Sequence, residues 1–301
     1  MNKSKVNDII NTKLKTANLM PVGLEENNMK TLPVGIQVYS LREEASKDFE
    51  GTMKRVKELG YDFVELAGLY GIPAAEVKAV LDKLELPCYS AHVSDLMGDG
   101  DIDKVLDDYV TIGCKYVVVP YLAEGLRPGD PNFDEILAKM ENVGKIARAK
   151  GMILLYHNHD FEFIRMPDGS YGLDYMYNNT APENLQTELD TCWVNVGGEN
   201  PAEYVKKYTG RAPVVHLKDF EGSKSEQMYE LIGIKSEKKE DVKNTFKFRP
   251  VGYGKQDFPA ILEAAVAAGA SYVVVEQDQW YDTPALECAK MSREYLKTLG
   301  W

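Results

Sequence analysis

Four ionisable side chains each lie where a run of residues typical of a β-strand ends. They close the segments 153–162, 185–190, 213–216 and 272–276, and they are Glu162, Asp190, His216 and Glu276. Carboxylate and imidazole groups are ligands for hard and borderline divalent cations. In a barrel of parallel strands, the carboxyl ends of the strands meet on one face, where such barrels carry out chemistry. Each residue alone would be explained as a helix cap or an ion-pair partner, but the set predicts a metal-dependent enzyme.

The histidines of the chain are all found at predicted strand ends: His92, His157, His159 and His216. A single histidine there is more often a hydrogen-bonded residue of the core than a ligand. All four on one face indicate a site, because histidines without a shared role would also fall on helices. Side chains alternate along a strand, so His157 and His159 are expected to share a face. We expect these two and His92 to relay protons or to bind substrate hydroxyls.

Three further residues near the strand ends are predicted to contact a substrate. Trp193 follows Asp190 by three positions. Its indole would exclude water or stack on a sugar face, with packing in the core as an equal alternative. Lys218 and Asp219 follow His216 directly. They are expected to point toward the substrate, unless they pair with each other.

The elements that must position these side chains are recognised by short β-branched runs that alternate with segments of helical spacing. Eight strands are predicted, at 34–39, 63–66, 87–92, 116–120, 153–157, 185–189, 213–217 and 272–276. Glycine supplies the left-handed residue that ends a helix, and it follows helical segments at Gly60, Gly113, Gly151 and Gly269. This alternation predicts an α/β protein with a single (β/α)8 TIM barrel. An open doubly wound sheet is disfavoured, because no G-x-G-x-x-G motif follows the first strand.

The chain divides into residues 1–31, an N-terminal extension or linker of unassigned role, and residues 32–301, the catalytic barrel domain. Within the barrel, the connection 219–254 is long and carries a charged run at 235–243. Long loops in compact domains are commonly functional or disordered, so this one is either a solvated insertion or a lid that leaves beside His216. The Gly252-x-Gly254 turn is a weak phosphate-binding signal, because such turns also serve close packing. Asp257 has the position of a helix N-cap.

Composition excludes several classes of function. The formal net charge of −12 disfavours a nucleic-acid partner, because phosphate backbones would be repelled. The four cysteines are scattered without a C-x-x-C pair, which favours reduced thiols in the cytoplasm over a zinc site or a disulfide framework. No apolar stretch is long enough to span a membrane.

Five motifs resemble one known superfamily, the xylose isomerase-like TIM barrels that include the sugar phosphate isomerases and epimerases. They are Asn158-His-Asp-Phe-Glu162, Glu188-Leu-Asp-Thr191, His216-Leu-Lys-Asp219, Gly252-Tyr-Gly254 and Val273-Val-Val-Glu276. The second and third look closest to the branch that contains inosose dehydratase and enzymes acting on 3-keto-glycosides. Trp193 stands where ketose epimerases commonly carry a histidine, which points away from a simple free ketose.

The resemblance implies a metal held by Glu162, Asp190, His216 and Glu276, with Mn²⁺ favoured and Co²⁺, Mg²⁺ or Zn²⁺ as alternatives. It also implies that Glu162 and Glu276 move protons. We therefore expect an isomerase or epimerase that abstracts a proton next to a carbonyl and forms a metal-stabilised enediolate. Its substrate would be a keto-sugar or related polyol, and such barrels often form homo-oligomers. A dehydratase or lyase using the same site is the alternative. An inactive sugar-binding barrel is less favoured, because the ligand set is intact.

Overall fold

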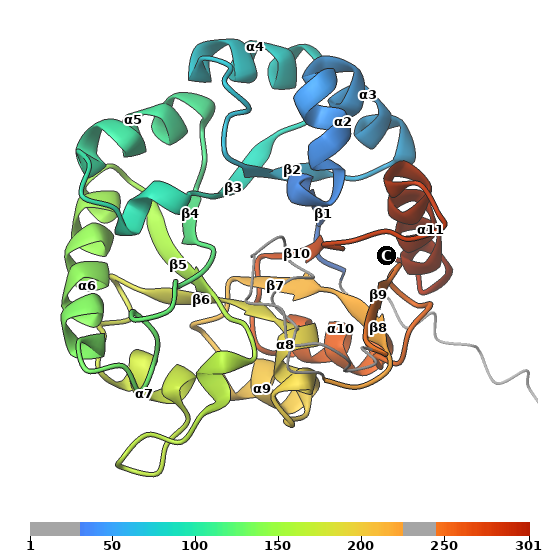
Figure 1. Ribbon diagram of the computed structural model, residues 1–301. Helices are drawn as coiled ribbons and strands as arrows, with labels where there is room; N and C mark the ends of the chain where they lie inside the picture. Colours follow the sequence, from blue (N-terminus) through green and yellow to red (C-terminus); the bar gives the residue numbers. More distant parts are fainter. Residues whose placement is uncertain (1–30, 225–244) are drawn as a thin grey trace, which may run out of the picture. The chain divides into compact units, whose positions relative to one another are not determined.

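Eight short segments form the parallel strands of a closed barrel in the computed structural model, which describes residues 31–224 and 245–301 (Figure 1). The strands are β1 (Val34–Gln37), β2 (Phe63–Ala67), β3 (Cys88–His92), β4 (Tyr116–Val119), β5 (Ile153–His157), β6 (Gln186–Asp190), β7 (Val214–Leu217) and β10 (Tyr272–Val275). Neighbouring strands follow chain order around the barrel, and β1 closes it by pairing with β10. The predicted (β/α)8 TIM barrel is thereby confirmed.

The barrel strands are buried along nearly their whole length, as parallel strands covered by helices must be. Both β4 and β10 have the sequence Tyr-Val-Val-Val, which suits a strand buried on both faces. Strand register then aligns the carboxyl ends. Asp190 on β6 is opposite His216 on β7, and the backbone N–H of Glu276 donates to the Leu217 carbonyl at 3.1 Å. Three of the predicted strand-end residues are therefore neighbours because of the pairing itself.

Helices surround the barrel and connect its strands (Figure 1). The α-helices are α2 (Arg42–Lys47), α3 (Phe49–Leu59), α4 (Ala74–Lys83), α5 (Ile102–Ile112), α6 (Phe133–Ala149), α7 (Gly172–Asn178), α8 (Thr191–Val196), α9 (Pro201–Lys207), α10 (Phe258–Ala267) and α11 (Ala285–Thr298). Short 3-10 helices are η1 (Val38–Leu41), η2 (Ser94–Met97) and η3 (Phe161–Phe163). Helix α5 is typical, because Leu106, Tyr109 and Ile112 recur at helical spacing and form its buried face.

Helix ends follow the signals in the sequence. Gly60 and Gly113 are the C-caps of α3 and α5, with φ angles of 87° and 96° in the left-handed region. Gly151 and Gly269 follow the ends of α6 and α10, and both also have positive φ. The Asp257 side chain accepts a hydrogen bond from the Ala260 N–H at 3.2 Å and caps α10. The predicted glycine stops and the predicted N-cap are confirmed.

The connection 219–254 contains a small sheet that the sequence did not reveal. Strands β8 (Asp219–Glu221) and β9 (Lys247–Arg249) pair antiparallel. They carry aromatic residues into a buried cluster made of Cys192, Trp193, Phe220, Phe246 and Phe248. The charged run 235–243, and with it the lid prediction, lies outside the described residues, as does the extension up to residue 30. None of the helices in residues 31–224 and 245–301 is both long and apolar enough to cross a membrane.

Candidate active site

Four donor side chains converge at the carboxyl end of the barrel. His157 ends β5, Asp190 ends β6, His216 lies on β7 and Glu276 follows β10. One donor atom of each lies within 4.8 Å of the others, and all four residues are buried. His157 Nε2 is 3.5 Å from Asp190 Oδ2 and 3.9 Å from Glu276 Oε2, while His216 Nδ1 is 2.9 Å from Glu276 Oε2. We refer to these four residues as the donor group.

The donor group fits a divalent cation. Asp190 Oδ2 makes no hydrogen bond within the described part of the chain. The other oxygen, Oδ1, accepts from the N–H groups of Cys192 and Trp193 at 2.8 and 3.1 Å and caps helix α8. The helix-cap interpretation of Asp190 is therefore correct for one oxygen and leaves the second free for a ligand role. Two imidazoles and two carboxylates suit borderline cations such as Mn²⁺, Co²⁺ and Zn²⁺.

The Lys218 side chain supplies a buried positive charge beside the donor group. Its Nζ is 3.0 Å from Glu276 Oε2, 3.3 Å from Asp190 Oδ2 and 2.9 Å from Asp278 Oδ2. Burial opposes the charged ammonium, yet these carboxylates raise the pKa of Lys218 well above its usual range. Burial also raises the pKa of Glu276, but Lys218 and His216 outweigh it and hold that pKa below its usual range. The ammonium thus stabilises the charged form of Glu276, whereas burial outweighs the ammonium at the other two carboxyls and raises the pKa of Asp190, and that of Asp278 to about 7.

The structure does not bring Glu162 to the donor group. Strand β5 ends at His157, and the chain then turns into η3, which contains Glu162. The Glu162 carboxylate accepts hydrogen bonds from the Tyr156 hydroxyl and, at 2.8 Å, from the His159 N–H. Burial raises its pKa to about 8. In the donor group, β5 is represented by the imidazole of its last residue, His157, and not by Glu162.

A pocket of about 340 Å³ opens beside the donor group, within the size range of roughly 300–1,000 Å³ typical of small-molecule sites. Its lining residues are Tyr39, Ala67, Gly68, His92, Ser94, Pro120, Tyr121, His157, His159, Lys218, Glu276 and Asp278. Of the predicted substrate-binding residues, His92 and Lys218 line this pocket, whereas Trp193 and Asp219 do not. Glu162, predicted as a ligand and proton carrier, is also absent from the lining.

His159 presents a neutral imidazole to the pocket. Its ring stacks on Phe161 with centroids 5.4 Å apart and lies 5.3 Å from the Trp193 ring. Burial and the nearby Lys218 hold the pKa of His159 well below its usual range. Its Nδ1 is buried and has no hydrogen-bond partner among the described residues. The imidazole is therefore neutral and is held by aromatic packing.

Trp193 and Asp219 have structural roles. Trp193 is fully buried in the aromatic cluster, stacked on Phe246 and edge-on to Phe248. The packing alternative thus describes Trp193, although its ring is 5.5 Å from Lys218 Nζ.

The Asp219 carboxylate holds the turn before α10 by accepting hydrogen bonds from four backbone N–H groups. The donors are Phe220, Gly252, Gly254 and Gln256. A Cβ on Gly254 would lie 2.3 Å from Asp219 Oδ1, so the glycine turn serves close packing.

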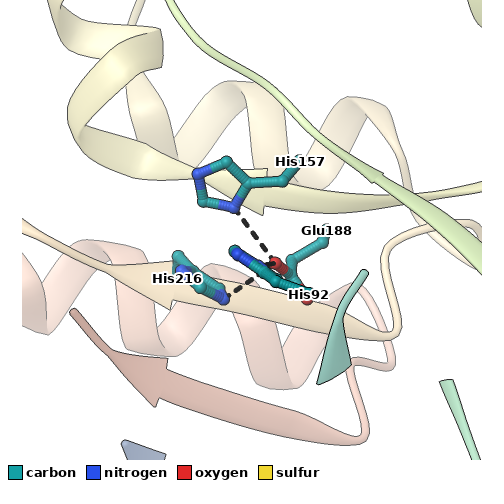
Figure 2. Close-up of side chains that lie close together, drawn as sticks. All are labelled: His92, His157, Glu188 and His216. Carbon is teal, nitrogen blue, oxygen red and sulfur yellow. Dashed lines mark hydrogen bonds and ion pairs between the residues drawn. The ribbon is translucent and has the colours of Figure 1, made fainter. Parts of the chain in front are cut away.

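Two buried glutamates beneath the donor group escaped the sequence prediction. Glu188 Oε1 lies 2.6 Å from His92 Nε2, 3.0 Å from His157 Nδ1 and 3.0 Å from His216 Nε2 (Figure 2). Glu65 Oε1 lies 2.9 Å from His216 Nε2 and 3.2 Å from His92 Nε2. Burial opposes a charge on His92, but both glutamates raise its pKa to about 10. The signal for Glu65 was a glutamate inside the otherwise apolar strand β2, which must have a buried partner. Strand β6 is itself polar and gave no such signal for Glu188.

Comparison with known proteins assigns the family. Residues 53–299 match the xylose isomerase-like TIM barrels. Inosose dehydratase of Clostridium beijerinckii is 24% identical over 317 residues, covering 96% of this chain and 98% of that protein. The crystal structure of a sugar phosphate isomerase/epimerase from Parabacteroides distasonis has a TM-score of 0.71 at 22% identity and covers 90% of this chain and 96% of that one. A 3-keto-D-glucoside 4-epimerase from E. coli has a TM-score of 0.63 at 18% identity, covering 89% and 99%. The chain belongs to the xylose isomerase-like TIM barrel family.

Proposed function

We propose that this protein is a divalent-metal-dependent lyase that removes water, or another β-oxygen substituent, from a keto-polyol or keto-sugar. The observation that carries the proposal is the convergence of His157, Asp190, His216 and Glu276 beside a pocket that also contains the neutral His159. The similarity to inosose dehydratases supports a substrate that is a polyhydroxylated ketone.

The donor group would hold the cation through His157 Nε2, Asp190 Oδ2, His216 Nδ1 and Glu276 Oε2. When bound, the cation would act as a Lewis acid on the carbonyl oxygen and a neighbouring hydroxyl oxygen of the substrate. The two imidazoles favour Zn²⁺ or Co²⁺ over Mg²⁺, and the two carboxylates also suit Mn²⁺. Among these ions Mn²⁺ is favoured by the family resemblance and not by the donor chemistry.

Proton transfer is assigned to His159. Its imidazole takes the proton from the carbon next to the carbonyl; the electrons of that C–H bond form the C=C bond of an enediolate, and the carbonyl π electrons move to the oxygen. Collapse of the enediolate reforms the carbonyl and expels the β-oxygen, which leaves as water when it takes the proton from the His159 imidazolium. The Lys218 ammonium lies beside the donor group and stabilises negative charge that develops on substrate oxygen.

Elimination is favoured over epimerisation because of where Glu162 lies. Epimerisation needs two proton-transferring groups on opposite faces of the substrate, and Glu162 and Glu276 were the expected pair. Glu162 is hydrogen-bonded outside the pocket lining. Epimerisation remains the second candidate, because His159 follows β5 and Glu276 follows β10, which are not adjacent strands. Those two groups would approach the substrate from different sides.

The test begins with protein stripped of metal by a chelator and restored separately with Mn²⁺, Co²⁺, Mg²⁺ or Zn²⁺. Each form is incubated in D₂O with a panel of inososes, keto-sugars and 3-keto-glucosides, and the products are identified by mass spectrometry and NMR. We expect metal-dependent loss of water or aglycone. Deuterium uptake without elimination would instead support epimerisation. Full activity in chelator would overturn the metal-dependent proposal.

A further inference from the structure

Two layers of carboxylates lie one above the other inside the barrel, with imidazoles between them. Glu188 and Asp190 are two residues apart on β6, so both point into the barrel at successive levels. Asp190 belongs to the donor group, whereas Glu188 lies below it among His92, His157 and His216 (Figure 2). His157 and His216 each reach both levels, because their two ring nitrogens face opposite carboxylates.

The protonated ring nitrogen of His157 can be assigned from these contacts. A carboxylate oxygen only accepts hydrogen bonds, so the proton of the 3.0 Å contact with Glu188 Oε1 lies on His157 Nδ1. A neutral His157 then presents the lone pair of Nε2 toward Asp190 Oδ2 and Glu276 Oε2. His216 contacts carboxylates through both nitrogens, so these contacts do not assign its tautomer. The upper nitrogen of His157 is the one that a cation requires.

We propose that Glu188 is a positioning residue that fixes which nitrogen of His157 faces the metal. The inference rests on the proposed metal site and adds the residue that prepares it. Carboxylates hydrogen-bonded to ligating histidines orient the ring and fix its tautomer in metal sites generally. Here one oxygen serves two ligands from different strands, β5 and β7.

A second cation within the lower cluster is a weaker explanation of the same contacts. The nitrogens of His92, His157 and His216 do lie close enough to Glu188 to form a four-residue donor set. A single oxygen, Glu188 Oε1, lies 2.6, 3.0 and 3.0 Å from the three imidazole nitrogens. This oxygen therefore occupies the centre of the lower cluster, where a cation would have to lie. The lower cluster is therefore a support for the donor group.

The test uses a graded pair of substitutions and a matched control. Glu188→Gln keeps an oxygen that accepts a hydrogen bond, whereas Glu188→Met has similar length and removes it. Glu65→Gln is the control, because Glu65 is equally buried and contacts His216 and His92, but among the described residues it forms no hydrogen bond or ion pair with His157. If Glu188 serves packing alone, Glu188→Gln and Glu188→Met should have similar effects. If Glu188 positions His157, only Glu188→Met should have a large effect.

Two readouts besides activity apply. The whole chain has four histidines, so ¹⁵N-histidine labelling gives four sets of imidazole signals that report the tautomer of each ring. In chelated wild-type protein we expect His157 to carry its proton on Nδ1. Glu188→Met should release this preference, and Glu188→Gln and Glu65→Gln should retain it.

The second readout is the affinity for Mn²⁺, measured by calorimetric titration. Glu188→Met should bind Mn²⁺ about 10–100-fold more weakly than the wild type, and Glu188→Gln should have an affinity between those of Glu188→Met and the wild type.

Either of two results would overturn the positioning role. One is a wild-type His157 protonated on Nε2. The other is a folded Glu188→Met variant with the wild-type tautomer and Mn²⁺ affinity. If Glu188→Met does not fold, the wild-type tautomer still decides. If wild-type protein binds no Mn²⁺, the proposed function fails, while the tautomer measurement still judges the role of Glu188.

Discussion

The buried Glu162 carboxyl makes the stability of the folded chain depend on pH. Burial raises its pKa from 4.5 to about 8. Between these two values the folded chain keeps a proton that the unfolded chain releases, so unfolding becomes easier as pH rises. The contribution of the protonated Glu162 carboxyl to the free energy of unfolding is complete below pH 4.5. It is lost progressively toward pH 8, by up to about 1.4 kcal/mol per pH unit. From pH 5 to pH 7 the loss amounts to roughly 3 kcal/mol.

Glu162→Gln should remove this dependence without removing the contacts. A glutamine oxygen can accept from the His159 N–H, and its amide can donate to the Tyr156 oxygen. We expect the free energy of unfolding of the variant to vary with pH by roughly 3 kcal/mol less than that of the wild type between pH 5 and pH 7. Urea unfolding followed by tryptophan fluorescence at pH 5, 6 and 7, in chelator, measures the difference. Glu58→Gln, at an exposed site, is the control. Parallel pH profiles for wild type and Glu162→Gln would refute the reasoning.

Three further predictions concern the site. His157→Ala should weaken Mn²⁺ binding by more than the roughly 10–100-fold typical of outer-shell changes, whereas Glu162→Gln should bind Mn²⁺ as tightly as the wild type. Calorimetric titration measures both affinities. If Glu162→Gln binds more weakly than His157→Ala, Glu162 is the ligand. Lys218→Met leaves buried carboxylates without their ammonium, so the metal-free protein should lose about 3–5 kcal/mol of stability. Added Mn²⁺ should restore part of this loss. An unchanged Tm of the chelated variant in scanning calorimetry would contradict the prediction. Asp219→Asn should cost about 1–3 kcal/mol, because an amide nitrogen cannot accept from the turn's N–H groups, and should leave Mn²⁺ affinity unchanged; urea unfolding and titration check both parts.

The strands and three of the donor residues could be predicted because both depend on local sequence and general geometry. Runs such as Tyr272-Val-Val-Val have few alternatives to a buried parallel strand. Once the strands are parallel, Asp190, His216 and Glu276 must come together at their carboxyl ends. The family resemblance and the fold agree on these three positions for that reason.

Glu162 could not be placed from sequence, because the chain after β5 follows local turn geometry that hydrophobic periodicity does not encode. Four polar and aromatic residues separate His157, the last residue of β5, from Glu162 in η3. Glu65 and Glu188 were missed for a different reason. A charge inside an apolar strand is stable only with partners from other strands, and those partners are known only once the barrel is closed. Strand β9, with three residues, is too short to show a period.

The two oxygens of Asp190 link the start of helix α8 to the proposed ligand role. One oxygen caps the helix, and the other faces the donor group. Position 190 therefore tolerates few substitutions when the pocket is redesigned for a new reaction. Asparagine would keep the helix cap but weaken cation binding, and alanine would remove both the cap and the ligand. Mutant libraries aimed at new substrates should leave this residue fixed and diversify pocket positions such as Tyr39, Ser94 and Tyr121.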